Sequence, residues 1–473
     1  MLNYDYNKTS AESILIYAEK LIWTQILSFL PKDFKDKKSN KGWIWQLIET
    51  HYFWKKLDNE SQPDFPEAWV EVKATTIKRI KKWEIRAKER LVLNIINYFI
   101  VVNENWESSS FLKKNSLILL IIYLYEEKNT KLENTIEIVE LFSFKEYKED
   151  YEIIKNDWLI IQNKIKGWKA HELSEWDTQY LWACTKGSTW WSPRFQPKSG
   201  ILAKQRAFSF KQGYMNFILK RIEWEQPRYE RLFKVRKPWF DFESELKKLF
   251  KPYIWKTIEY ISNKFDIINN WTNPKQFYSI LSNKILWVTN NENIEEFNKA
   301  NIKLKTTVQT PSWNLRENIS FPAFKISDLI NEKWEDSEIY NTLESQKFFF
   351  VVFKITTKTE SEFDRLSPNE QAKNLILSKV VLWNTPSKDI EEKAKPTWEK
   401  TIKIIKEWVV LTPKQTKSKI IIQNNLPAKS ETEMIHVRPH WVKWDIDILP
   451  GWRGITKQCF WFNRDYIIKE LWI

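Results

Sequence analysis

Hydrophobic and charged positions alternate most regularly near residue 70. Val70, Glu71, Val72 and Lys73 follow one another as apolar, acidic, apolar and basic side chains, which is the pattern of a half-buried β-strand. Because successive side chains of a strand point to opposite faces, Glu71 and Lys73 are expected on the same face. We therefore predict a strand within 63–75 that presents a carboxylate beside an ammonium group.

Periodic apolar positions predict helices in the flanking segments. Thr9 and Glu12 have the spacing of a capping box in front of an apolar run that continues to Leu30. A second helix is expected across 44–52, just before the predicted strand.

The middle of the chain is rich in apolar residues. Region 80–165 reads mostly as helix, with its longest apolar-rich segments at 90–102 and 116–127. Both segments are too short to span a bilayer, so we expect buried helices and no membrane anchor. Composition further predicts loops and strands at 166–215, an interdomain linker or a linking helix at 219–240, and an exposed insertion at 388–432.

An internal repeat divides the chain. Residues 64–73 and 296–305 align without a gap at an offset of 232, with the phenylalanine, alanine and final lysine identical. A second pair of similar blocks, 207–214 and 459–466, follows in the same order. A repeat in this order predicts two related domains. We expect these at residues 1–225 and 240–473, joined by a linker at 226–239.

The second copy lacks the charges of the first. Lys303 stands where the first copy has Glu71, although Glu296 could replace Asp64. The segment that corresponds to the helix at 44–52 has no carboxylate. We expect a catalytically inactive, DNA-binding second half; the alternative is divergence without a retained function, because a shared fold does not settle function.

Charge and composition bound the class of protein. The 473 residues carry a net charge of +14, which suits a polyanionic partner such as nucleic acid. The alternative is a lysine-rich proteome that raises the charge of every protein.

Only two cysteines, Cys184 and Cys459, are present, which excludes a disulfide framework and favours the reducing cytoplasm. His436 and His440 are separated by Pro439, so a shared metal-binding helix face is not expected.

Tryptophan is unusually abundant and glycine unusually scarce. The chain has 28 tryptophans and 7 glycines; together they make up about 7% of the residues, the ordinary share of glycine alone. Trp190, Trp191 and Trp452 lie in turn sequences that favour glycine. We hypothesise that most of these codons are UGA, read as glycine in the source cell. Codons UGG at Trp45, Trp69 and Trp176 would contradict this hypothesis; the alternative is a tryptophan-rich, carbohydrate-binding protein.

Asp64, Glu71 and Lys73 have the layout of a metal-dependent nuclease site. A hairpin could bring Asp64, just upstream of the strand, beside Glu71, and two carboxylates can hold a hard divalent cation. Lys73 could then orient an attacking water and stabilise charge on a phosphate. With 29% charged residues, such a loose pattern also arises by chance about once in a chain of this length.

These segments resemble a known family. Residues 41–49, 63–65 and 68–73 are similar to the MutH-type branch of the PD-(D/E)xK nucleases, most closely when Trp45 and Trp69 are read as glycine. Further segments narrow the resemblance to the two-domain, GATC-specific type II restriction endonucleases of the Sau-three-A-I type. These are residues 87–98, 170–175, 183–187, 203–208, 436–439 and 456–460.

The resemblance implies a fold and a set of functional residues. The fold would be α/β (α+β), a tandem of two MutH-like restriction-endonuclease-type domains, each a mixed central sheet flanked by helices. Asp64 and Glu71 would ligate Mg²⁺ with help from the Val72 carbonyl, Lys73 would position the water, and Glu49 would be the third acidic residue. The alternative for Glu49 is a solvated helix carboxylate.

The same resemblance implies contacts with DNA. Lys186 and Ser209 would lie at the DNA, and Lys186 could read guanine or only contact phosphate. His171 is expected to be structural.

The resemblance also implies a substrate and partners. The substrate would be double-stranded DNA cut at 5′-GATC-3′, with a dimer forming on DNA and a GATC methyltransferase as genetic partner. A mismatch-repair nicking enzyme and a non-catalytic DNA-binding protein are the alternatives.

Overall fold

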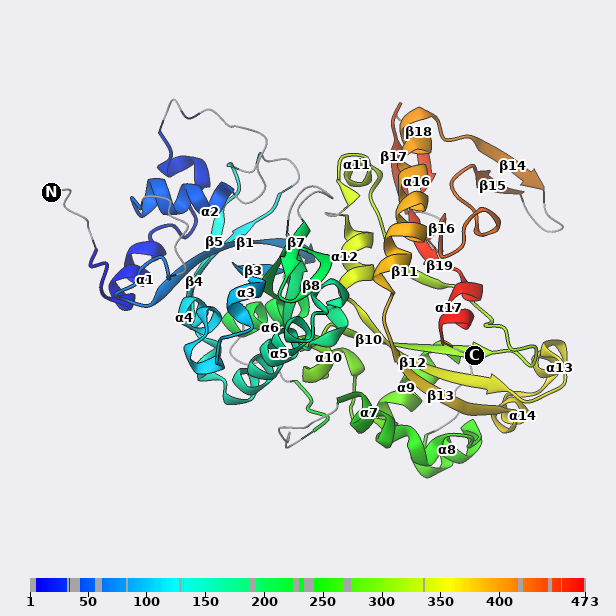
Figure 1. The fold of residues 1–473 in the computed structure, drawn as a ribbon. Coiled ribbons are helices and arrows are strands. Elements are labelled where there is room, and N and C mark those ends of the chain that lie inside the picture. Colours follow the sequence, from blue (N-terminus) through cyan, green and yellow to red (C-terminus); the bar gives the residue numbers. More distant parts are fainter. Residues whose placement is uncertain are drawn as a thin grey trace. The chain divides into compact units, whose positions relative to one another are not determined.

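The computed structural model divides the chain into two compact units. The first unit contains Met1–Tyr229 together with Asn298–Asn301, and the second contains Glu230–Phe297 together with Ile302–Ile473 (Figure 1). No helix in the described part is long and apolar enough to cross a membrane. The structure describes every residue except 1–5, 32–33, 35–42, 56–61, 82–83, 127–129, 131, 187–192, 224–228, 234–241, 268–273, 335–336, 416–419, 441–444, 452 and 472–473.

A four-stranded mixed sheet forms one half of the first unit. Its strands are β1 (Val70–Lys81), β2 (Glu84–Ala87), β4 (Leu117–Leu124) and β5 (Ile136–Phe142), in the order β2-β1-β4-β5. Strand β1 pairs in parallel with β4 and antiparallel with β2, and β4 pairs antiparallel with β5.

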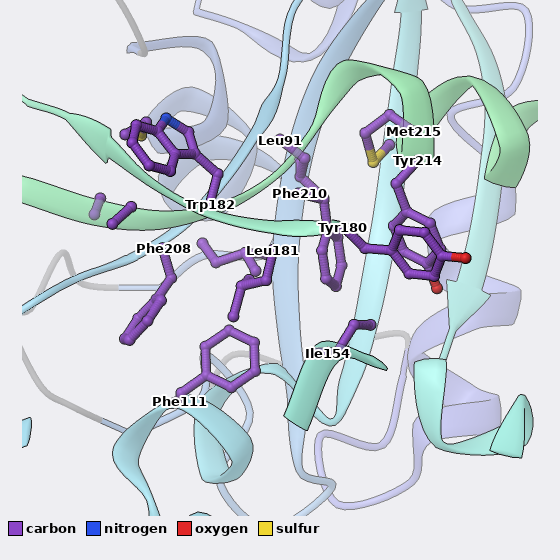
Figure 2. Close-up of a cluster of buried hydrophobic side chains, with 14 of the residues drawn as sticks. Leu91, Phe111, Ile154, Tyr180, Leu181, Trp182, Phe208, Phe210, Tyr214 and Met215 are labelled. Carbon is purple, nitrogen blue, oxygen red and sulfur yellow. The ribbon is translucent and has the colours of Figure 1, made fainter. Parts of the chain in front are cut away.

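A second, antiparallel sheet completes the first unit. It has the order β3-β9-β6, from β3 (Leu91–Ile95), β9 (Arg206–Phe210) and β6 (Leu181–Thr185), and the hairpin β7 (Pro193–Gln196)–β8 (Ser199–Lys204) precedes β9. Figure 2 shows the core that this sheet shares with its helices, where the rings of Tyr180 and Tyr214 stack at 4.9 Å between centroids. Phe208 also meets Phe111 edge to face, so burial of aromatic surface joins the sheet to the preceding helix.

The helices of the first unit lie before, between and after these strands. The α-helices and the π-helical turn are α1 (Ala11–Glu19), α2 (Trp43–Leu47), η2 (Ile48–Tyr52), α3 (Tyr98–Val101), α4 (Ser110–Asn115), α5 (Lys148–Lys166) and α6 (Gln212–Glu223). Short 3-10 turns lie at η1 (Ile26–Phe29), η3 (Trp106–Ser108), η4 (Phe144–Glu146), η5 (Ala170–Glu172) and η6 (Glu175–Asp177).

The second unit repeats this order of strands. Strand β10 (Ile302–Gln309) pairs in parallel with β12 (Lys347–Ile355), which pairs antiparallel with β13 (Leu375–Trp383). A separate antiparallel sheet has the order β11-β19-β16, from β11 (Ile319–Ala323), β19 (Gln458–Phe462) and β16 (Ile435–Pro439). The first residues of β1 and β10 are separated by the same 232 positions as the sequence repeat.

Helices and two hairpins complete the second unit. The hairpins are β14 (Leu411–Gln415)–β15 (Ile420–Asn424) and β17 (Ile446–Leu449)–β18 (Arg453–Thr456). The α-helices and the π-helical turn are α7 (Phe242–Phe250), α8 (Ile258–Lys264), α9 (Pro274–Ile285), α10 (Glu295–Lys299), α11 (Ile326–Leu329), α12 (Glu338–Ser345), α13 (Glu360–Arg365), α14 (Pro368–Lys373), α15 (Ser387–Asp389), η10 (Ile390–Ala394), α16 (Lys395–Glu407) and α17 (Arg464–Leu471). The last two residues of α10 belong to the first unit. The 3-10 turns are η7 (Lys251–Tyr253), η8 (Asn291–Asn293) and η11 (Lys429–Glu431).

The prediction of helix across much of 80–165 is wrong. Segment 116–127 contains strand β4, whose residues 118–122 are all fully buried between β1 and β5. An interior strand covered on both faces is continuously apolar, so it lacks the alternation that identifies a half-buried strand. Segment 90–102 splits into β3 and α3, because the Asn97 side chain caps the short helix by accepting from Phe99 N–H and Ile100 N–H.

Of segment 219–240, the residues up to Glu223 lie in helix α6. Two further expectations need correction. The first helix ends at Glu19 rather than Leu30, and its N-cap is Ser10 rather than Thr9. The region 388–432 is not simply an exposed insertion, because α16 buries Trp398 and Ile405. The turn tryptophans Trp190, Trp191 and Trp452 fall outside the described residues.

Candidate active site

Strand β1 places Glu71 and Lys73 on the same face. Val70 and Val72 alternate with them and are fully buried in the hydrophobic cluster that includes Phe65. The Lys73 ammonium donates to Glu71 Oε1 at 2.5 Å. Only 1% of Glu71 is exposed, so its carboxylate meets protein groups rather than bulk water.

A tight turn brings Asp64 beside Glu71. Phe65 and Val70 exchange backbone hydrogen bonds of 2.9 and 3.2 Å, which closes the chain over the four residues between them. Asp64 N–H then donates to Glu71 Oε2 at 3.2 Å, and Val72 N–H donates to Asp64 Oδ2 at 2.9 Å. The two carboxylates are therefore held together by backbone groups of the turn and the strand.

Glu49 approaches this pair from the π-helical turn η2. Only 5% of Glu49 is exposed. Burial, reinforced by the negative charge of Asp64, raises the pKa of Glu49 to about 8, while Lys73 and Lys55 act in the opposite direction. Burial also raises the pKa of Glu71. Glu49 is not the solvated helix carboxylate that was the alternative interpretation.

Two lysines that the sequence did not point to also lie at these carboxylates. The Lys55 ammonium is 3.0 Å from Asp64 Oδ1, and the Lys114 ammonium is 3.7 Å from Glu71 Oε1. Lys114 comes from helix α4, so its position depends on how that helix packs against β1. For Lys55, the only indication in the sequence is that it lies nine residues before Asp64.

The donor set fits a hard divalent cation. Asp64 and Glu71 are joined by the hydrogen bond from Asp64 N–H to Glu71 Oε2, and burial raises the pKa of Glu71 while the nearby lysines oppose this shift. Within the described residues, no three His, Cys, Asp or Glu side chains already enclose a metal position. Lysine ammonium groups lie instead against one oxygen each of Asp64 and Glu71. The geometry can hold a cation, orient a nucleophile through Lys73 and exclude bulk water from Glu71.

The matching strand of the second unit is built differently. Lys303 occupies the second position of β10, as Glu71 does in β1, and its side chain is exposed. Glu296 is buried, but its carboxylate accepts hydrogen bonds from Leu232 N–H and Phe233 N–H at 3.2 and 3.3 Å. Both carboxylate oxygens of Glu296 therefore accept hydrogen bonds from the backbone of residues 232–233.

The predicted DNA-contacting residues have contrasting environments. Lys186 is exposed at the end of β6, where its N–H donates to Gln205 O at 2.7 Å. Ser209 is fully buried in β9, so its hydroxyl offers no surface to a ligand in this conformation. His171 Nδ1 lies 3.2 Å from Gln196 Nε2, in keeping with a structural role.

Comparisons with known proteins agree with the geometry. A family profile described as DNA mismatch repair enzyme MutH matches residues 53–157. That range contains Asp64, Glu71, Lys73 and Lys114. Over 470 residues the chain is 37% identical to the type II restriction enzyme Sau3AI of Staphylococcus aureus, covering 92% of this chain and 93% of that protein.

Proposed function

We propose that this chain, which belongs to the family of the type II restriction enzyme Sau3AI, cleaves double-stranded DNA at 5′-GATC-3′ with Mg²⁺. Membership of that family makes it a site-specific endonuclease; the sequence cut and the metal are the proposed parts. The interlocked Asp64, Glu71 and Lys73 on β1 are the observation that carries the proposal.

Each residue of the cluster has a proposed task. Asp64 and Glu71 would hold Mg²⁺, with the Val72 carbonyl as a further ligand, and the ion would activate water and offset charge on the phosphate. Lys73 would hold the attacking water in line with the phosphate. Glu49 would be the third acidic residue of the site; its raised pKa favours the protonated form, and a nearby cation would favour the ionised form that can accept a proton from the water.

The second unit would bind DNA without cutting it. Lys303 replaces a metal ligand by a cation, and Glu296 is engaged with backbone N–H groups. Lys186 of the first unit would contact DNA from the end of β6. Ser209 is not among the proposed contacts, because it is buried. We also propose that two copies pair on DNA, in the cytoplasm, with a GATC methyltransferase protecting the host.

The alternatives predict different products. A nicking enzyme of mismatch repair would leave one strand intact, and a binding protein without catalysis would leave both. Similarity to the restriction enzyme extends over nearly the whole chain, while the mismatch-repair profile covers 53–157. This extent favours restriction.

Digestion of unmethylated plasmid separates these functions. We expect linear fragments that end at GATC with Mg²⁺ and none with EDTA. Glu71→Ala and Lys73→Ala should abolish cleavage while duplex binding persists, and Lys303→Ala, the matched change in the second unit, should leave cleavage chemistry intact. Nicked circles alone would favour the repair function, and cleavage that survives Glu71→Ala would refute the site assignment.

A further inference from the structure

Most left-handed backbone positions in the described part of the chain hold tryptophan. Among the described residues, ten that are not glycine have positive φ, and seven of these are tryptophan, with φ between 53° and 66°. An L-residue in this region places its Cβ against the following carbonyl, so it is disfavoured, while glycine adopts it freely. The seven are Trp23, Trp54, Trp69, Trp168, Trp255, Trp287 and Trp313.

The side chains of these seven tryptophans do not explain their positions. Their exposed fractions lie between 49% and 79%, so the indoles contribute little buried surface to offset a strained backbone. Trp106 and Trp158 are the contrast: both are buried, and their rings meet at 5.6 Å between centroids. The chain therefore contains two kinds of tryptophan, one that packs in the core and one that does not.

Two helix ends show what the left-handed positions require. After α5, Trp168 N–H donates a hydrogen bond to Ile165 O, and Lys169 N–H donates one to Lys164 O. This is the Schellman motif that ends many helices, and Trp168 occupies the left-handed position that is usually glycine. Trp287 takes the same position after α9. After α8 the position holds Asp266, a residue type that tolerates this backbone region.

Two of the seven lie at the active site. Trp69 ends the turn that closes over Phe65 and Val70, one residue before β1. Trp54 follows η2 and precedes Lys55, whose ammonium meets Asp64. The backbone at 54 and 69 therefore helps to position Glu49, Lys55 and Glu71.

We propose that these seven positions are glycine in the working protein, and that glycine at 54 and 69 positions the catalytic carboxylates. These are therefore the positions at which we expect UGA codons that the source cell reads as glycine. Trp69 is among them, whereas Trp45 and Trp176 lie in helical turns. The assignment of glycine rests on backbone geometry alone, whereas the positioning role at 54 and 69 rests on the proposed function.

Thermal unfolding of matched variants tests the proposal. The reference is the chain with glycine at all seven positions. Restoring tryptophan at 168 alone is expected to lower Tm by roughly 2–8 °C. Placing alanine there should lower it nearly as much, because alanine keeps the Cβ but removes the exposed indole. The control Trp158→Gly should lower Tm by more, since it removes a buried side chain from a helix.

The same set of variants defines the refuting results. If the alanine variant matches glycine at 168, the indole rather than the backbone is responsible and the proposal is overturned. It is also overturned if the seven-glycine chain melts no higher and is no more soluble than the chain as written, or if the seven codons are UGG. Restoring tryptophan at 69 should slow plasmid cleavage more than restoring it at 313; equal rates would remove the positioning role.

Discussion

Glu49→Gln should make the protein more stable at alkaline pH while removing its activity. Glu49 is buried, and its pKa rises from 4.5 to about 8, first through burial and then through Asp64. A carboxyl whose pKa is raised on folding is more easily ionised in the unfolded chain. The contribution of Glu49 to the free energy of unfolding is therefore most favourable below pH 4.5, and it is lost as the pH rises towards 8. Glutamine has the same shape and does not ionise.

The magnitude follows from linkage. One pKa unit corresponds to about 1.36 kcal/mol. Between pH 5 and pH 8 the parent protein should therefore lose roughly 3 kcal/mol of unfolding free energy that the variant keeps. For a unit of this size that difference corresponds to a Tm higher by roughly 6–12 °C at pH 8.

Thermal unfolding in EDTA at pH 5 and pH 8 measures this difference without a bound cation. Glu67→Gln changes an exposed carboxylate of the turn before β1 and serves as control, with an expected effect within about 0.5 kcal/mol at both pH values. Plasmid digestion with Mg²⁺ gives the second readout, because the variant should not cleave. A Tm difference that is the same at both pH values would refute the account of Glu49.

Three further predictions concern the lysines and the core. Lys55→Met should strengthen Mn²⁺ binding, measured by calorimetric titration, because it removes a cation 3.0 Å from Asp64; unchanged affinity would contradict this competition. Lys186→Ala should reduce the salt dependence of DNA binding by about one charge if it contacts phosphate, or lower discrimination for GATC if it contacts a base; binding that is unchanged in both respects would exclude a contact. Ile121→Ala should cost about 2–5 kcal/mol in guanidinium unfolding, because Ile121 is fully buried in β4; a loss below 1 kcal/mol would contradict an interior strand.

The local part of the site could be predicted from the sequence. Glu71 and Lys73 lie two residues apart on one strand, and Asp64 is joined to them by a short turn. Strand periodicity and turn length are properties of neighbouring residues, so a short segment determines them.

The remaining features depend on contacts that no short segment contains. Lys114 reaches Glu71 only because α4 packs near β1. Strand β4 has the continuous apolar pattern of a buried helix because a hydrophobic cluster covers each of its faces, one containing Leu120 and the other Ile121. An alternating pattern would have identified it only if one face had met water.

Charge balance explains how such a buried cluster can be stable. Glu49, Asp64 and Glu71 place three carboxyl groups near one another, and Lys55, Lys73 and Lys114 place three ammonium groups near them. Burying an uncompensated carboxylate costs several kcal/mol, so the lysines stabilise the cluster. A divalent cation would then give the cluster an excess positive charge, which favours the approach of a phosphate. In the proposed function the lysines would therefore have two tasks in succession: they would neutralise the carboxylates before a cation binds, and they would attract DNA afterwards.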